Sequence, residues 1–201
     1  MTSGVNCLKK RLLESARVME RVAEEQAATI FEVGELIAEA VLGGKCLFLF
    51  GNGGSAADCQ HLAAEFVGRF VLERRPLSAI ALTTDTSALT AIANDYGYEQ
   101  VFERQIEALV REGDVAIGIS TSGGSENVVL GLQAARNRGA IAVALTGGKP
   151  GKCGDVAEKV ISVPSEVTAR VQESHIAIGH LFCEMVDDRW QSRASRSGEG
   201  A

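Results

Sequence analysis

Proline and aromatic residues are scarce in this chain of 201 residues, which has 3 prolines and an aromatic content of 5%. Few prolines favour long uninterrupted helices, because proline breaks helices and central strands. The 5 cysteines include no CxxC pair, which argues against a disulfide scaffold and predicts free thiols in a reducing cytoplasm. No apolar run approaches the roughly 20 residues that a membrane span needs, and the polar start is not a secretory signal.

Basic residues are fewer than acidic ones. The chain has 20 Lys and Arg residues and 26 Asp and Glu residues, which gives a net charge of −6. This balance argues against a broad nucleic-acid-binding surface, although it is compatible with a local pocket for a small anion. The hydrophobic content of 46% and the charged content of 23% are those of a globular protein. We therefore expect a cytoplasmic protein with no nucleic-acid partner and no membrane partner.

A long helical segment is expected at the N-terminus, at about residues 5–42. Apolar residues recur there at spacings of three and four from Leu8 to Val41. The segment is either one helix or two helices that meet near Glu24–Gln26. Its apolar surface exceeds what one sheet face needs, which suggests contact with helices of other subunits. Packing entirely within its own chain is the alternative.

Five short, continuous apolar runs predict strands that are buried on both faces, as in a parallel sheet. These runs lie at residues 46–50, 78–82, 115–119, 140–145 and 159–163. Helical patterns separate them at residues 55–70, 87–94, 98–111 and 125–137. The alternation predicts an α/β fold with a doubly wound, five-stranded parallel sheet flanked by helices, whereas it does not give the strand order.

One domain is expected over residues 1–190, because no repeat and no interdomain linker interrupts the pattern. Its last element is a second long helical stretch, Val167–Trp190. The small, polar residues that follow, 191–201, are expected to form a flexible C-terminal tail.

The junction Phe50–Ala57 follows a predicted strand and precedes a predicted helix, at the edge where parallel α/β sheets bind ligands. Its glycines allow the backbone to approach a ligand closely, and Asn52 and Ser55 contribute side-chain donors. The pattern is neither a P-loop nor a dinucleotide fingerprint. Ser55 is also suited to cap the helix, which is compatible with a binding role.

A second junction, Ile119–Asn127, is rich in hydroxyl groups and also precedes a helix. It contains Ser120, Thr121, Ser122 and Ser125. Hydroxyls and free backbone N–H groups at a helix N-terminus are suited to bind a phosphate dianion. Because no Lys or Arg lies in this loop, hydrogen bonds and the helix dipole would meet the charge. A polar loop with a capping serine is the alternative.

A candidate metal and acid/base cluster draws on two helices. His61 and Glu65 are four residues apart and share a helix face. Gln172 and His180 are eight residues apart on the last helix and point broadly the same way. Together they suit zinc or a similar divalent ion, although His61 and Glu65 alone are more often a solvated pair. The spacing does not show whether the helices meet, and His175 is interpreted as structural or interfacial.

The two glycine-rich loops, Gly51–Ser55 and Ser120–Ser125, together resemble those of the sugar isomerase (SIS) fold, whose members bind phosphosugars with a Ser/Thr-rich loop. More narrowly, Gly51–Phe70, Ala93–Gly97 and the spacing from Gln172 to His180 resemble the phosphoheptose isomerase family. The similarity extends from the N-terminal helix to about Asp188, and the motifs are highly specific only in combination.

This resemblance implies one zinc ion per subunit, bound by His61, Glu65, Gln172 and His180, with Glu65 and His180 as the acid/base pair. It implies a homotetramer with a central helical bundle and sites near subunit interfaces. It also implies that a larger set of residues contacts the phosphosugar. That set is Asn52, Gly53, Gly54, Ser55, Glu65, Asn94, Asp95, Ser120, Thr121, Ser122, Ser125 and Gln172.

The activity that the resemblance implies is an aldose–ketose isomerisation of sedoheptulose 7-phosphate to D-glycero-D-manno-heptose 7-phosphate through an enediol. In the family this is the first step towards the nucleotide-activated heptose of lipopolysaccharide or related surface glycans. Glu65 is a suitable base and His180 a suitable proton partner for the substrate oxygens, while a divalent ion would stabilise the enediolate.

Two alternative functions are compatible with the same fold but involve no catalysis. One is a noncatalytic SIS protein that binds the replication initiator, and the other is a phosphosugar-sensing regulatory domain. The acid/base set favours the enzyme over the first, because a binding module needs no proton-transfer pair. The lack of an attached DNA-binding segment counts against the second.

Overall fold

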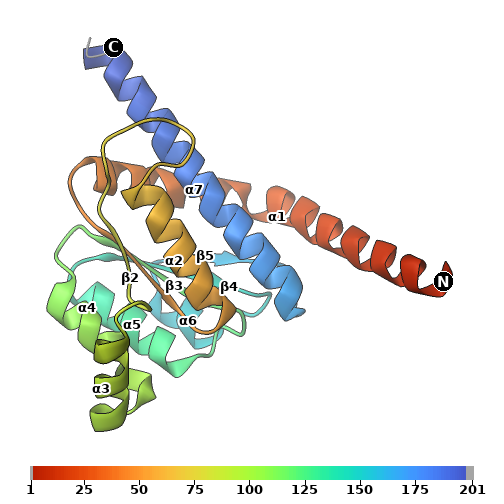
Figure 1. The fold of residues 1–201 in the computed structure, drawn as a ribbon, viewed down its shortest axis with the longest axis horizontal. Coiled ribbons are helices and arrows are strands. Elements are labelled where there is room, and N and C mark those ends of the chain that lie inside the picture. The colour runs from red at the N-terminus through yellow and green to blue at the C-terminus, as the bar shows by residue number, and fades with distance from the viewer. Residues whose placement is uncertain (1, 198–201) are drawn as a thin grey trace.

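A five-stranded parallel sheet forms the centre of the computed structural model, which describes residues 2–197 (Figure 1). Its strands are β1 (Leu47–Gly51), β2 (Ala79–Ala81), β3 (Val115–Ser120), β4 (Ile141–Thr146) and β5 (Lys159–Ser162). Every pairing is parallel, and the strand order is β2-β1-β3-β4-β5. The five predicted strands and the doubly wound parallel sheet are confirmed.

The helices that cover the sheet follow the predicted pattern, with differences at residues 98–111 and 151–156. They are α1 (Thr2–Leu42), α2 (Gly54–Val67), α3 (Thr86–Tyr96), the 3-10 helix η1 (Tyr98–Gln100), α4 (Glu103–Leu109), α5 (Glu126–Asn137), α6 (Gly151–Val156) and α7 (Thr168–Ser197). The N-terminal segment is one helix and not two. The helix expected at 98–111 is divided into η1 and α4, and the short α6 was not predicted.

Each face of the sheet has its own hydrophobic core. Along β1, Leu47 and Leu49 pack with α1, α2 and α7, whereas Phe48 and Phe50 pack with α4 and α5. Side chains alternate between the faces of a strand, so a strand that is covered on both sides must be apolar at every position. This packing explains the continuous apolar runs of the sequence, and it places α2 and α5 on opposite faces.

The long helices α1 and α7 pack together on one face and then extend beyond the sheet in different directions (Figure 1). On the projecting N-terminal part of α1, the apolar side chains of Val5, Leu8 and Leu12 are exposed. Their spacing of three and four places them on one side of the helix. Within residues 2–197, no helix combines the length and the apolarity that a membrane crossing requires.

Helix α7 extends past residue 190, where the sequence predicted its end, and continues to Ser197. No glycine or proline interrupts residues 191–197, and the hydroxyls of Ser192 and Ser195 donate to carbonyls four residues earlier. The first part of the expected tail is therefore helical. Residues 198–201, the remainder of that tail, lie outside the described residues.

His175 attaches α7 to the end of β4. Its Nε2 lies 3.0 Å from the carbonyl oxygen of Thr146, its ring is fully buried, and Nδ1 has no partner among residues 2–197. Burial lowers the pKa of His175 to about 4, and the contact with Thr146 opposes this shift only in part. The imidazole is therefore neutral and donates from Nε2, which fits a structural role.

The pKa of His175 predicts how stability depends on pH. The unfolded chain binds a proton at His175 near pH 6.5 and the folded chain only near pH 4, so stability falls as the pH drops through that window. Glutamine keeps an N–H donor but does not titrate. We expect the Tm of the parent to fall more steeply between pH 6.5 and pH 4 than the Tm of His175→Gln in thermal unfolding. Parallel curves would contradict this assignment.

Candidate functional site

The strand order places the topological switch point of the sheet between β1 and β3, and we refer to this edge as the crevice. The chain leaves β1 towards β2 on one side of the sheet and leaves β3 towards β4 on the other, and the intervening helices α2 and α5 lie on opposite faces. Ligands of open parallel sheets bind at such a topological switch point. Because Gly51 is paired with Ile119 in register, the glycine-rich and the serine-rich loops begin side by side.

Asn52 is held in place by a small hydrogen-bond network across this crevice. The carboxamides of Asn52 and Asn127 bond to each other twice, at 2.9 Å each, and the Tyr98 hydroxyl donates to Asn52 Oδ1 at 3.0 Å. Asn127 is buried in the first turn of α5. The network therefore links the loop after β1 to the helix after β3 and fixes the orientation of the Asn52 amide.

Three hydroxyls of the serine-rich loop lie close together. Ser120 Oγ donates to Ser125 Oγ at 3.0 Å and lies 3.5 Å from Ser122 Oγ. Ser125 occupies the N-cap position of α5, yet its side chain accepts no backbone N–H there. The capping interpretation of this loop is therefore wrong for Ser125, whose hydroxyl faces the other serines, and the loop keeps its hydroxyls for an anion.

The two helices whose contact the sequence left open do meet. His61 Nε2 on α2 lies 2.9 Å from His180 Nε2 on α7, and it lies 3.7 Å from Glu65 Oε1. The ring of Phe70 stacks on His180. Glu65 and His180 therefore both approach the same nitrogen of His61. The His61 side chain is 48% exposed, so the cluster is open to a ligand.

Gln172 lies against the glycine-rich loop, and Asp58 lies near the histidine pair. A Cβ atom on Gly54 would lie 2.6 Å from Gln172 Nε2, so this carboxamide covers the glycine-rich loop and needs a glycine beneath it. Burial raises the pKa of Asp58, one turn before His61, and the neighbouring His61 and His180 oppose the shift. Of the predicted ligands, Gln172 thus lies directly against the glycine-rich loop.

Comparison with known proteins gives one consistent result. Residues 12–147 match the SIS domain family. A phosphoheptose isomerase of Aquifex aeolicus is 56% identical over 181 residues, which cover 90% of this chain and 95% of the relative. The chain belongs to the phosphoheptose isomerase family. It is accordingly an isomerase with an SIS fold.

Solved structures agree with this family assignment. The phosphoheptose isomerase of Neisseria gonorrhoeae is 41% identical and superimposes with a TM-score of 0.86, covering 91% of this chain and 98% of that one. The phosphoheptose isomerase of Francisella tularensis is 32% identical with a TM-score of 0.88, covering 94% and 100%. The match to proteins of similar length shows that the fold extends over nearly the whole chain.

In the described part of the chain, several residues that the family resemblance assigns to substrate binding form no hydrogen bond with the histidine pair. Ser55 is buried in the first turn of α2, where Gly53 and not Ser55 occupies the N-cap position. Asn94 and Asp95 are exposed on α3 and bond to each other at 2.8 Å. Within residues 2–197, neither makes a hydrogen bond to the serine-rich loop or to the histidines.

The predicted zinc ligands have the right chemistry without forming a complete cluster. Within residues 2–197, no three or more His, Cys, Asp or Glu side chains are arranged to hold a metal ion. His61 Nε2 nevertheless lies 2.9 Å from His180 Nε2 and 3.7 Å from Glu65 Oε1, and imidazole nitrogen and carboxylate oxygen are donors that zinc prefers. The donor set therefore fits a divalent ion.

Sequence reasoning missed three residues of the crevice. Asp58 lies three positions before His61, a spacing that places both on one helix face and was available as a signal. Asn127 and Tyr98 contact Asn52 from distant parts of the chain. No local pattern reveals such contacts, because they depend on the strand order.

Proposed function

We propose that this isomerase interconverts sedoheptulose 7-phosphate and D-glycero-D-manno-heptose 7-phosphate, as the first step towards a nucleotide-activated heptose for lipopolysaccharide or related surface glycans. The observation that carries the proposal is the convergence of Glu65 and His180 on His61, where α2 and α7 meet. A carboxylate and an imidazole from two distant helices are thus available at one crevice for the proton transfers of an aldose–ketose isomerisation.

In this mechanism, the serine-rich loop binds the phosphate. The hydroxyls of Ser120, Ser122 and Ser125 and the N-terminus of α5 supply hydrogen bonds and a favourable dipole, without an ion pair. Thr121 belongs to the same loop. Binding the phosphate at β3 directs the other end of the sugar towards the loop after β1, since the two loops begin side by side.

Proton transfer then falls to Glu65 and His180. Glu65 removes the proton from the carbon next to the carbonyl and returns it to the neighbouring carbon, while His180 moves protons between the two substrate oxygens. The contact between the His61 and His180 nitrogens requires one ring to donate and the other to accept. The two rings therefore hold complementary tautomers while this hydrogen bond exists.

We further propose that zinc binds at His61, Glu65, Gln172 and His180, one ion per subunit, and supplies Lewis-acid stabilisation of the enediolate when bound. Prolonged chelation is expected to reduce turnover of sedoheptulose 7-phosphate to background, and added zinc is expected to restore it. Metal analysis of the purified protein gives an independent readout, with about one zinc per chain expected and much less in His61→Asn. Full turnover by the metal-free protein would contradict the proposal.

A homotetramer in the cytoplasm is proposed as the working state of the protein. Exposed apolar side chains support association through the long helices, with Val5, Leu8 and Leu12 on α1 and a groove between α1 and α7 bordered by Phe31 and Leu181. Burial of such surface stabilises association. The five free cysteines are compatible with a reducing compartment. Measurement of the mass in solution tests the assembly.

The decisive experiment incubates the protein with sedoheptulose 7-phosphate and detects aldoheptose phosphate by NMR. Formation of that product supports the proposal, and its absence under zinc-replete conditions would overturn it. The same result separates the enzyme from a noncatalytic SIS protein that binds the replication initiator and from a phosphosugar sensor. Both would bind without turnover.

A further inference from the structure

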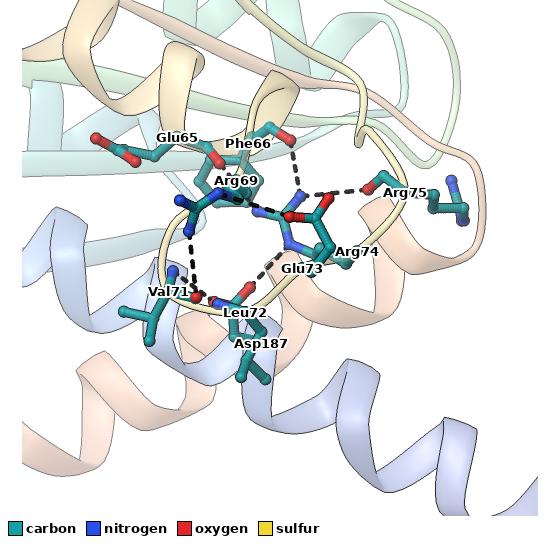
Figure 2. Close-up of polar contacts among 9 residues, drawn as sticks. All are labelled: Glu65, Phe66, Arg69, Val71, Leu72, Glu73, Arg74, Arg75 and Asp187. Atoms are coloured by element: carbon teal, nitrogen blue, oxygen red, sulfur yellow. Dashed lines mark hydrogen bonds and ion pairs between the residues drawn. The ribbon is translucent and has the colours of Figure 1, made fainter. Parts of the chain in front are cut away.

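A buried ion pair lies next to the acid/base site and contacts the predicted ligands only at the main-chain carbonyl of Glu65 (Figure 2). Arg74 Nε donates to Asp187 Oδ1 at 2.8 Å, and the two side chains are only 0% and 4% exposed. Burying two charges costs desolvation free energy, which is offset only where the geometry is good and further hydrogen bonds satisfy both groups. The partners of these hydrogen bonds indicate what the pair does.

The guanidinium of Arg74 binds the last turn of α2. Nη2 donates to the carbonyl oxygen of Glu65 at 2.9 Å, and Nη1 donates to that of Phe66 at 2.9 Å. The last four carbonyls of a helix have no partner within the helix, so Arg74 caps the end of α2. Figure 2 shows the Glu65 carboxylate pointing away from Arg74. Arg74 thus holds the backbone of Glu65 and leaves its carboxylate free.

The carboxylate of Asp187 connects the same group to α7. Its Oδ2 accepts from the backbone N–H groups of Val71 and Leu72, at 3.0 Å each. Asp187 lies seven residues, about two helical turns, after His180, so both residues share one face of α7. One buried pair therefore joins the backbone that carries Glu65 to the helix that carries His180.

We infer that Arg74 and Asp187 are positioning residues that set the separation of Glu65 from His180 and thereby the rate of proton transfer. The inference rests on the proposed function, because it takes those two residues as the acid/base pair. Neither positioning residue contacts the crevice through its charge. The rate is sensitive to such positioning, since a displacement of about 1 Å can cost about 100-fold.

The variants Arg74→Lys and Asp187→Asn test the inference. A lysine ammonium keeps the charge but cannot bond Asp187 and both helix carbonyls in the fixed fork of a guanidinium. Asparagine keeps the shape but replaces one acceptor oxygen by an N–H donor. In each variant, assayed with zinc well below its own Tm, we expect kcat to fall about 10- to 100-fold and KM to stay within about three-fold.

The double variant supplies a second readout. If Arg74 and Asp187 act as one unit, replacing either of them already removes the effect of both. The double variant is therefore expected to have a kcat no lower than that of the worse single variant. The pH profile of kcat should keep its shape while its height falls, because the ionising groups are unchanged. The inference would be overturned if the fold-loss of kcat in the double variant equalled the product of the two single losses. A change in KM with kcat unchanged would also overturn it.

Two control variants separate positioning from stability. Arg189→Met breaks the contact of α7 with Glu35 of α1, two residues beyond Asp187, and Val33→Ala weakens the buried face of α1. Both should keep kcat within about two-fold even where Tm falls as far as in Arg74→Lys. Equal losses of kcat in Val33→Ala would overturn the inference. A parent protein without turnover would overturn the proposed function, whereas an active parent with an unaffected Arg74→Lys overturns only this inference.

Discussion

Replacement of Glu65 by glutamine is expected to lower kcat for sedoheptulose 7-phosphate by about 100- to 10,000-fold, the usual contribution of a general base. The carboxamide keeps the shape of the side chain and its place beside His61, but it cannot accept a proton from carbon. Because the serine-rich loop is untouched, KM should change far less than kcat. Steady-state kinetics with zinc present measure both quantities.

A matched control for this variant is Glu73→Gln. Glu73 follows the same helix and pairs only loosely with Arg69 at 3.7 Å, with a side chain that is 89% exposed. It should keep parental kcat. Circular dichroism and Tm show whether Glu65→Gln has folded. Parental turnover by a folded Glu65→Gln protein would remove Glu65 from the chemistry and leave the fold assignment intact.

Replacement of Gly123 by alanine is expected to raise KM by about 10- to 100-fold and to lower Tm by several degrees. Gly123 has a φ of +66°, and a Cβ there would lie 2.2 Å from the carbonyl oxygen of Pro150. The left-handed conformation alone costs about 1–2 kcal/mol. Relief of the overlap must shift the serine-rich loop, and each lost hydrogen bond to a charged phosphate costs about 1.5–3 kcal/mol.

Gly124→Ala is the control one position further along. A Cβ on Gly124 has only Ser122 Oγ within reach, at 3.9 Å, and its φ lies outside the left-handed region. This variant should keep KM within about three-fold and the parental Tm. Substrate saturation curves and thermal unfolding distinguish the two glycines. Equal behaviour of the two variants would contradict a phosphate site that depends on the exact path of this loop.

Much of the fold could be predicted because its signals are local. Continuous apolar runs identify strands that are covered on both faces, and this alone located all five strands to within one residue or so. The strand order carries no such signal, since it depends on which strands pair. The end of α7 was missed because small polar residues permit a helix as well as a tail, and no glycine or proline stops it before Ser197.

The candidate site could be predicted only where its residues share a helix or a loop. The pattern of His61 and Glu65 is local, whereas their contact with His180 depends on how α2 and α7 pack. Arg74 is an example of a residue whose environment could not be predicted from the sequence. It lies in the run Glu73-Arg-Arg-Pro76, which as sequence is typical of solvated surface, yet its side chain is fully buried. Burial of a charge depends on partners over a hundred residues away.

The fixed carboxamide of Asn52 has a consequence for the sugar itself. Its oxygen already accepts from Asn127 and Tyr98, and one of its two N–H bonds is used by Asn127, so a single N–H is left to offer. A substrate atom that bonds to this N–H must therefore be a hydrogen-bond acceptor. Ketone, alcohol and enediolate oxygens all qualify, and the bond strengthens as negative charge accumulates on that oxygen. Asn52 would thus bind ketose and aldose alike, and it would bind the enediolate intermediate more strongly than either.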